Sequence, residues 1–598
     1  MQTHYRNILL LESKNFLDSF GSEFDAKSDL VLTFDFGVKK EIEEMGGDAH
    51  YIDHLCTTSE MQENNILASD FFKKWHYDQS GNDVFFEKGI PFGFTFRIEI
   101  WSEYLFYVRL RANLEKLKKI RYKKLFLGEK NGHIGKILLE IGIRNTIIDS
   151  IGNSGNNIYY FDIHKYMYDA LHGKSIKNIL IDKAFKLFFN LRWYIDVYLR
   201  PNHKLITVYA QIYHPTKEIV KRLKRDASLR VVTPSLFNDA GLKKYFGQQL
   251  IPIRGNKKSF NKQSELFMSA FREKKCTSLI LQDGTNITEG AYRVIEHQIE
   301  PRISEVLQTL HSVILYAEKF PISLEIMIAN IGLIQTVVDC FLKSKGVPSY
   351  LIINGLLGGD FCDESKYATY VNCYSESIKK YYYKGADNVF CLGDPRMDGY
   401  VNTSNKRSVN RVNPTITIGT SGFNNLDLNS YVAVEFEFMY DVLSAFEQLQ
   451  AEGKTFNLII KVRPNGYLKQ YIAFVGEYFR DLKVEVIRDV LISEIFKKTD
   501  LYISIYSQTL FEASCLGIPV IYYKKDNEIL DPPFDQKSEL VTVDAIEKLK
   551  QAYIDFLSEH NRYNAFLDKR VMEKYVGYLD GNNLERNLEF INKLLPRE

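Results

Sequence analysis

Short apolar runs alternate with amphipathic stretches along the first part of the chain. The runs RNILLLES (6–13) and DLVLTFDFG (29–37) have the length and composition of buried strands, and the charged stretch VKKEIEEMGG that follows has those of a helix. Strand, helix and strand joined by short connections are typical of a parallel sheet. The segment KKLFLGEKNGHIGKILLEIGIRNTIIDS (123–150) repeats this order. The pattern predicts an α/β fold.

The same alternation returns twice after Pro201. In the second series we expect strands at 203–210, 229–235, 277–284, 323–330 and 348–355, and the segment 387–400 closes the series. The polar segment 401–414 ends in proline and indicates a linker. In the third series we expect strands at 415–422, 456–464, 483–489, 500–507 and 519–525. We therefore predict three α/β portions: an N-terminal one (1–195), a middle one (196–405) and a C-terminal one (412–598).

Composition narrows the class of protein. The 598 residues are 45% apolar and 25% charged, as in a globular protein of several domains, and the net charge of +2 gives no field that would recruit nucleic acid. The seven cysteines are scattered without CxxC spacing, which favours a reducing cytosol over disulfides or a zinc site. We expect no signal peptide in MQTHYRNILLLESKNF and no transmembrane helix, and thus a cytoplasmic protein with at most peripheral membrane contact.

Polar groups follow three expected strands of the C-terminal portion. Open α/β sheets bind ligands at the carboxyl ends of their strands. A glycine-containing turn there can cradle phosphate with its N–H groups, and cations can pair with it. The candidate donor-binding residues are Gly419, Thr420, Ser421 and Gly422 in the first group, Lys461 and Arg463 in the second, and Ser504, Ser507, Gln508, Thr509 and Glu512 in the third.

The third group permits two interpretations. Ser507 and Thr509 lie where a helix begins, so hydroxyl and N–H groups can point at one anion, and Glu512 one turn later can accept both hydroxyls of a ribose. Alternatively, Ser507 is a helix cap, Glu512 is solvated, and CLGIPVIYY is a helix end followed by a core strand.

The stretch QTLFEASCLGIPVIYY resembles the donor-binding helix and strand of GT-B glycosyltransferases. Thr509 and Glu512 match the T-x-x-E pattern of some inverting members, in which the resemblance implies that the glutamate binds the nucleotide ribose. Retaining members with an E-x7-E motif carry a second glutamate eight residues earlier, where this chain has Ser504. That subtype is therefore disfavoured.

A second resemblance lies upstream. CFLKSKGVPSYLIINGLLGGDF and YVNCYSESIKKYYYKGADNVFCLGDPRMDGY are similar to the layout of CDP-glycerol polymerases and capsule Kdo transferases. Ser375 matches the hydroxyl before a helix in that group, and the closing motif is matched by Gly393, Pro395, Arg396 and Asp398. The resemblance covers about 330–525 and implies two Rossmann-like domains facing a cleft, here with an additional N-terminal α/β portion.

This sequence departs from the pattern at two places. Many relatives have Gln-His-Gly where this chain has Asn354-Gly355-Leu356, and His-Pro where it has Arg463-Pro464. Neither the identity of the donor nor that of the catalytic base can therefore be carried over from these motifs.

The expected base must come from the portion that faces the donor. Asp283, at the end of the expected strand LILQDG, is the first candidate and Glu289 the second, although Asp283 equally suits a plain turn. His214 is interpreted as a helix cap. Glu129 and His133 suit an acceptor groove or, with more weight, a turn. The basic stretch RLRANLEKLKKIRYKK (109–124) either lies on an anionic membrane or packs its leucines inward.

Together these patterns predict a glycosyltransferase that transfers a sugar from a CMP-, CDP- or UDP-linked donor to a bacterial surface glycan, such as lipopolysaccharide O-antigen or capsule. The expected acceptor is a glycan or a lipid-linked glycan, reached at the cytoplasmic face of the inner membrane. No DxD motif follows an expected strand, so no metal and no separate cofactor are predicted. The alternatives are a CDP-glycerol-type polyol-phosphate transferase, a nucleotide-sugar 2-epimerase and a catalytically inactive glycan-assembly protein.

Overall fold

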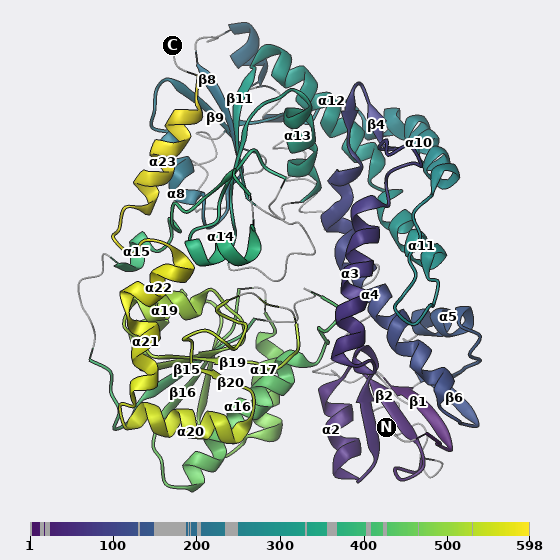
Figure 1. Cartoon of the computed structure of the whole chain (residues 1–598), viewed down its shortest axis with the longest axis vertical. Helices are drawn as coiled ribbons and strands as arrows, with labels where there is room; N and C mark the ends of the chain where they lie inside the picture. The colour runs from purple at the N-terminus through teal and green to yellow at the C-terminus, as the bar shows by residue number, and fades with distance from the viewer. Residues whose placement is uncertain are drawn as a thin grey trace.

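The computed structural model of this chain contains three sheets of parallel strands (Figure 1). The structure describes residues 3–11, 17, 24–128, 132–148, 187–188, 191, 193–199, 205–233, 249–328, 332–355, 367–384, 386–401, 408–421, 427–464, 466–528, 530 and 532–596. The predicted α/β class is confirmed. Each of the three predicted portions contains one of these sheets.

The first sheet has five strands in the order β3-β2-β1-β6-β7. Its strands are β1 (Asn7–Leu11), β2 (Leu30–Thr33), β3 (Asp48–Tyr51), β6 (Lys124–Gly128) and β7 (Thr146–Ile148). Its helices are α2 (Phe36–Glu44), α3 (Thr58–Lys74), α4 (Arg97–Glu115) and α5 (Gly132–Glu140). The short antiparallel pair β4 (Phe86–Glu87) and β5 (Ile90–Pro91) lies between α3 and α4 in the chain.

The second sheet has seven strands in the order β10-β9-β8-β11-β12-β13-β14. They are β8 (Ile206–Ala210), β9 (Leu229–Thr233), β10 (Gln249–Leu250), β11 (Ile322–Ile328), β12 (Ser349–Ile352), β13 (Tyr370–Asn372) and β14 (Val389–Phe390). The accompanying helices are α8 (Lys217–Leu223), α10 (Asn261–Lys274), α11 (Thr288–Ile299), α12 (Ile303–Lys319), α13 (Leu333–Ser344), α14 (Glu376–Tyr382) and α15 (Asp398–Val401).

The strand expected at 277–284 is wrong. This segment is a small hairpin between α10 and α11, in which Ile280 bridges Asn286 and the N–H of Gly284 donates to the carbonyl of Leu281. Gly284 has a φ of +85°, which suits a tight turn. Leu279 and Leu281 are buried among helices rather than in a sheet, so their alternation imitates that of a strand.

The third sheet has six strands in the order β17-β16-β15-β18-β19-β20. They are β15 (Thr415–Gly419), β16 (Asn457–Lys461), β17 (Val484–Ile487), β18 (Leu501–Ser504), β19 (Val520–Tyr523) and β20 (Thr542–Val543). The helices are α16 (Val434–Ala451), α17 (Leu468–Tyr478), α18 (Ile492–Phe496), α19 (Thr509–Cys515), α20 (Ile546–Leu557), α21 (Asn564–Leu567) and α22 (Lys569–Val576).

The C-terminal helix α23 (Asn583–Leu594) leaves the third sheet and returns to the second, where it lies beside α8 (Figure 1). Tyr350 on β12 donates its hydroxyl proton to Asn587, and the ring of Phe590 contacts that of Tyr350 at 5.0 Å between centroids. The second and third sheets thus form two Rossmann-like units joined by a returning helix. With the first sheet as an additional unit, this is the GT-B-like fold that the sequence predicts.

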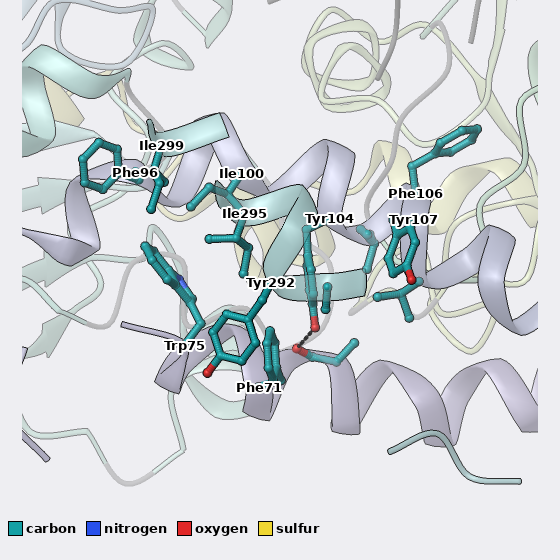
Figure 2. Packing of buried hydrophobic residues seen from close by; sticks show 14 of the residues in the cluster. Phe71, Trp75, Phe96, Ile100, Tyr104, Phe106, Tyr107, Tyr292, Ile295 and Ile299 are labelled. Carbon is teal, nitrogen blue, oxygen red and sulfur yellow. Dashed lines mark hydrogen bonds between the residues drawn. The ribbon is translucent and has the colours of Figure 1, made fainter. Parts of the chain in front are cut away.

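A shared aromatic core joins the first unit to the helices of the second. Tyr104 on α4 donates its hydroxyl proton to the carbonyl of Ala68 on α3 at 2.7 Å, and Phe71 meets Tyr292 of α11 edge to face at 5.1 Å (Figure 2). Leu110, Leu114 and Leu117 of the basic stretch are buried. The prediction that this stretch packs its leucines inward is therefore confirmed. None of the helices in the described ranges is long and apolar enough to cross a membrane.

Candidate functional site

A group of hydroxyls lies where β18 leads into α19. The hydroxyl of Thr509 lies 2.6 Å from that of Tyr502 and 2.8 Å from that of Ser507, and the Ser507 oxygen accepts the N–H of Thr509 at 3.3 Å. The capping interpretation is right in part, and the donor-binding interpretation stays a prediction. Ser507 is not the N-cap of α19, which is Gln508, although its oxygen accepts the first helical N–H. Strand β19 is fully buried, as the capping interpretation expects of the core strand. The hydroxyls nevertheless gather at the carboxyl end of the sheet.

Glu512 is not a solvated helix residue. Its Oε2 accepts the hydroxyl proton of Tyr400 at 2.6 Å, and Tyr400 belongs to α15 of the preceding unit. Burial raises the pKa of Glu512, while the Tyr400 hydrogen bond and the charge of Arg396 oppose that rise. The carboxylate therefore lies at the junction of the second and third units.

Polar side chains from both units surround this junction. Arg396 donates from Nε and Nη2 to the carboxylate of Asp394, at 3.0 and 2.8 Å, and Gln508 Nε2 donates to Asp394 Oδ2 at 3.3 Å. Within the described ranges, the buried Oε1 of Gln508 finds no hydrogen-bond partner. A Cβ added to Gly355 would lie 4.0 Å from this oxygen. An acceptor atom is thus available where the two units meet.

The turn after β15 is held by its own neighbours. The N–H of Ser421 donates to Glu435 Oε1 at 3.1 Å, the N–H of Arg463 donates to Thr420 Oγ1 at 3.2 Å, and the Arg463 guanidinium donates to the carbonyl of Ser421. Position 419 requires glycine because the side chain of Tyr502 lies close to the backbone there, and a Cβ would lie 1.9 Å from Tyr502 Oη. The N–H of Ser421, expected to donate a hydrogen bond to phosphate, already donates to Glu435. Gly422 lies outside the described residues.

Two further candidate donor-binding residues, Lys461 and Ser504, donate hydrogen bonds to backbone carbonyls near the ends of strands. The ammonium group of Lys461 donates to the carbonyls of Val462 and Arg488, at 2.7 and 2.8 Å, and burial lowers its pKa. Ser504 is fully buried and donates to the carbonyl of Gly419 at 3.0 Å. These contacts position the strand ends, and a direct role in donor binding stays a prediction.

The two candidate bases lie on a different part of the molecule. Asp283 is exposed in the hairpin before α11 and accepts the N–H of Thr285 at 3.0 Å, and the neighbouring N–H of Gln282 donates to Asn64 on α3. Glu289 is exposed in the first turn of α11. In Figure 1, α11 lies at the outer edge beyond α4, whereas α14, α15 and α19 lie on the opposite side. A catalytic role for either residue stays a prediction.

His214 is not a helix cap. Helix α8 begins at Lys217, and Thr216 Oγ1 holds the preceding turn by accepting the N–H of Tyr213 at 3.1 Å. Partial burial, followed by the charges of Arg396 and Lys217, lowers the pKa of His214. The imidazole thus follows β8 and lies within the field of Arg396. Sequence reasoning missed this placement and the contact of Asp394 with Gln508, because Gln508 lies 114 positions from Asp394 and Arg396 is likewise remote from His214 in sequence. Glu129 and the side chain of His133 lie outside the described residues.

Comparison with known proteins gives similarities of fold. No protein-family model and no curated protein matches the chain. S. aureus MnaA bound to UDP has a TM-score of 0.42 at 11% identity, over 66% of this chain and 99% of that one. UDP-GlcNAc 2-epimerase from Neisseria meningitidis has a TM-score of 0.41 at 12% identity, over 65% and 99%. The wall teichoic acid polymerase TagF has a TM-score of 0.36 at 11% identity, over 69% and 98%. Similarities at this level assign no activity.

Proposed function

We propose that this chain is a GT-B-like glycosyltransferase that transfers a sugar from a nucleotide-activated donor to a growing bacterial surface glycan, such as O-antigen or capsule. The observation that supports this most is the half-buried Glu512 carboxylate at the junction of two Rossmann-like units, beside Asp394, Arg396 and Gln508. Open α/β sheets bind their ligands at the carboxyl ends of the strands, which is where this junction lies.

In this proposal Glu512 accepts the hydroxyls of the donor ribose. Tyr400 occupies Oε2, so Oε1 is the first acceptor for a ribose hydroxyl, and Gln508 Oε1 is a second acceptor nearby. Ser507, Thr509 and Arg463 would meet the phosphates, since a cation and hydroxyl donors stabilise the charge of the leaving diphosphate or monophosphate. The nucleotide, whether CMP, CDP or UDP, is a substrate rather than a resident cofactor.

His214 is a further candidate for the catalytic base, after Asp283 and Glu289. A lowered pKa keeps the imidazole neutral at pH 7, and a neutral imidazole can accept the proton of an acceptor hydroxyl. His214→Gln should then reduce turnover by about 100-fold or more while nucleotide affinity stays unchanged. Asp283→Asn tests the first candidate in the same assay. Full turnover in His214→Gln would remove His214 from this role.

Nucleotide binding tests the proposal directly. Isothermal titration with CMP, CDP, UDP and GDP should identify at least one ligand, and Glu512→Ala should weaken its binding by about 10- to 100-fold, the worth of hydrogen bonds to a charged group. Glu494→Gln, an exposed carboxylate on α18, is the matched control. Unchanged affinity in Glu512→Ala would refute the ribose assignment.

The same titrations separate the alternatives. Binding and turnover of CDP-glycerol would favour the polyol-phosphate transferase, and conversion of a nucleotide sugar without an acceptor would favour the 2-epimerase. Failure to bind any of the nucleotides would favour the inactive assembly protein. In the described ranges, no group of three or more His, Cys, Asp or Glu is arranged to hold a metal ion. Metal independence stays a prediction, tested by turnover in excess EDTA.

A further inference from the structure

A separate pocket of about 750 Å³ opens between α4, α5 and the start of α11. Its lining includes Tyr107 and Arg111 of α4, Glu140 of α5, and Glu289 and Arg293 of α11. The volume lies within the range of ~300–1,000 Å³ that is usual for sites of small-molecule ligands. The α11 side of this pocket lies away from α15 and α19 (Figure 1), so it is distinct from the junction at Glu512.

The aromatic walls of the pocket are held in place. Tyr107 on α4 and Tyr292 on α11 are buried within the packed core of Figure 2. A Cβ added to Gly290 would lie 1.6 Å from Tyr107 Oη, so the bare glycine makes room for this phenol. The Tyr292 hydroxyl accepts the N–H of Thr277 at 3.2 Å. These restraints indicate a pocket that is formed before any ligand binds.

Each cation that lines the pocket is paired with a carboxylate. Arg293 pairs with Glu140 between α11 and α5, Arg111 shares Glu115 with Lys118, and Lys275 shares Glu296 with Arg272. Glu289 is an exposed carboxylate of the lining and forms no ion pair in the part of the chain that the structure describes. A phosphate or carboxylate ligand would therefore compete with carboxylates that already engage these cations, and it would be repelled by Glu289.

We propose that this pocket binds a neutral saccharide. Vicinal hydroxyls of a sugar ring suit a single exposed carboxylate, which accepts two hydrogen bonds, so Glu289 is the main acceptor. Asn286 and Ser278 in the lining supply further polar groups. This ligand class gives Glu289 a binding role rather than a catalytic one, at a site separate from nucleotide binding.

Saturation-transfer NMR on the full chain, with a panel of maltose, lactose, cellobiose and N,N′-diacetylchitobiose, tests the proposal. At least one of these disaccharides should bind, and inorganic phosphate should not displace it. Glu289→Gln should weaken its affinity by about 10-fold, since a neutral amide replaces a charged acceptor. Glu300→Gln, an exposed carboxylate after the last turn of the same helix, is the matched control and should bind as the unmodified chain does.

A second variant guards against a folding effect. Ser278 is exposed in the lining, so Ser278→Trp should fill the pocket and abolish binding while the melting temperature is retained. Nucleotide titrations of both variants should match those of the unmodified chain, which separates failure of this site from failure of the proposed function. The proposal is overturned if no disaccharide of the panel binds, if phosphate competes, or if binding persists in Ser278→Trp.

Discussion

At the scale of single residues, part of the motif that carries the resemblance has a structural task. The Asp398 carboxylate accepts the N–H groups of Asn583 and Leu584, at 3.1 and 2.8 Å, where α23 begins. Gly393 has a φ of +78°, and a Cβ there would lie 2.0 Å from Asn583 Oδ1. The G-x-P-R-x-D motif therefore fastens the C-terminal helix to the second unit, in addition to placing Arg396 at the junction.

Removing the carboxylate at the start of α23 should loosen this helix. Asp398→Ala leaves two N–H groups of the first turn without acceptors, so the free energy of unfolding should fall by about 1–2 kcal/mol, as for other lost helix caps. Urea denaturation measures the change, and Asp387→Ala, at an exposed position before β14, is the control. Equal stability of the two variants would contradict the capping role.

Sequence reasoning reached some residues of the candidate site and missed their partners. The spacing of Thr509 and Glu512 was recognisable because both lie on one local stretch. Tyr400 lies 112 positions from Glu512, and no local pattern links them. The same holds for the charge of Arg396 that lowers the pKa of His214, because the two residues lie on segments far apart in the sequence.

At the scale of elements, the first unit docks directly on the third. The ring of Phe36, at the start of α2, contacts Tyr440 of α16 and Phe474 of α17, with centroids 5.3 and 5.6 Å apart. Tyr51 on β3 and Tyr431 before α16 both donate to Glu437, at 3.0 and 2.7 Å. The N-terminal unit is therefore packed against the expected nucleotide-binding unit, although the two are far apart in sequence.

Truncating the aromatic anchor of this contact should destabilise the fold. Phe36→Ala removes a buried ring from an aromatic cluster, so the free energy of unfolding should fall by about 3 kcal/mol or more. Phe86→Ala removes a ring that is 55% exposed on β4 and serves as the control. Thermal unfolding of both variants measures the difference, and a change of less than about 1 kcal/mol in Phe36→Ala would exclude a stabilising interface here.

The elements themselves were largely predictable because apolar runs of four to seven residues give most of the sheet strands, such as β1, β11 and β18. The hairpin at 277–284 has the sequence pattern of a strand, because the same apolar residues occur where a segment is buried between helices and where it is buried in a sheet. The docking of α2 on α16 was beyond prediction, because an aromatic residue at a helix start does not reveal which surface covers it.

At the scale of the whole molecule, a buried polar group links the first and third units. Arg109 on α4 is fully buried, donates to the carbonyl of Asp427 at 2.8 Å and lies 3.9 Å from the carboxylate of Asp53. Burial raises the pKa of Asp53 to about 6, although Arg109 opposes the rise. Burial likewise raises the pKa of Asp526 to about 7, with Lys524 opposing the rise and Asp427 adding to it.

These raised pKa values determine how stability depends on pH. Between about pH 4 and 7 the folded chain holds protons that the unfolded chain releases, because an unfolded aspartate has a pKa near 3.9. The stabilisation is fully present below that value and is lost as pH rises through the folded pKa values of about 6 and 7. These two aspartates should therefore lower stability from pH 5.5 to pH 8, whereas the lowered pKa values of His50, His54, His214 and His297 raise it as pH rises towards 6.5. The net fall is expected above about pH 6.5. The depressed pKa of Glu60, about 2, acts at lower pH and leaves this window unaffected.

Asp526→Asn separates this effect from the rest of the molecule. The amide keeps an oxygen that can accept the N–H of Glu528, as Asp526 Oδ1 does at 3.2 Å, but it has no proton to lose. The slope of unfolding free energy against pH should become shallower by up to about 1.4 kcal/mol per pH unit, the value for one proton. Urea denaturation at pH 5.5, 6.5, 7.5 and 8 gives the slopes, with Asp70→Asn on the exposed face of α3 as the control. Parallel curves for the unmodified chain and Asp526→Asn would mean that this carboxyl keeps its charge in the folded interface, in which case Lys524 and Arg109 together outweigh the cost of burial.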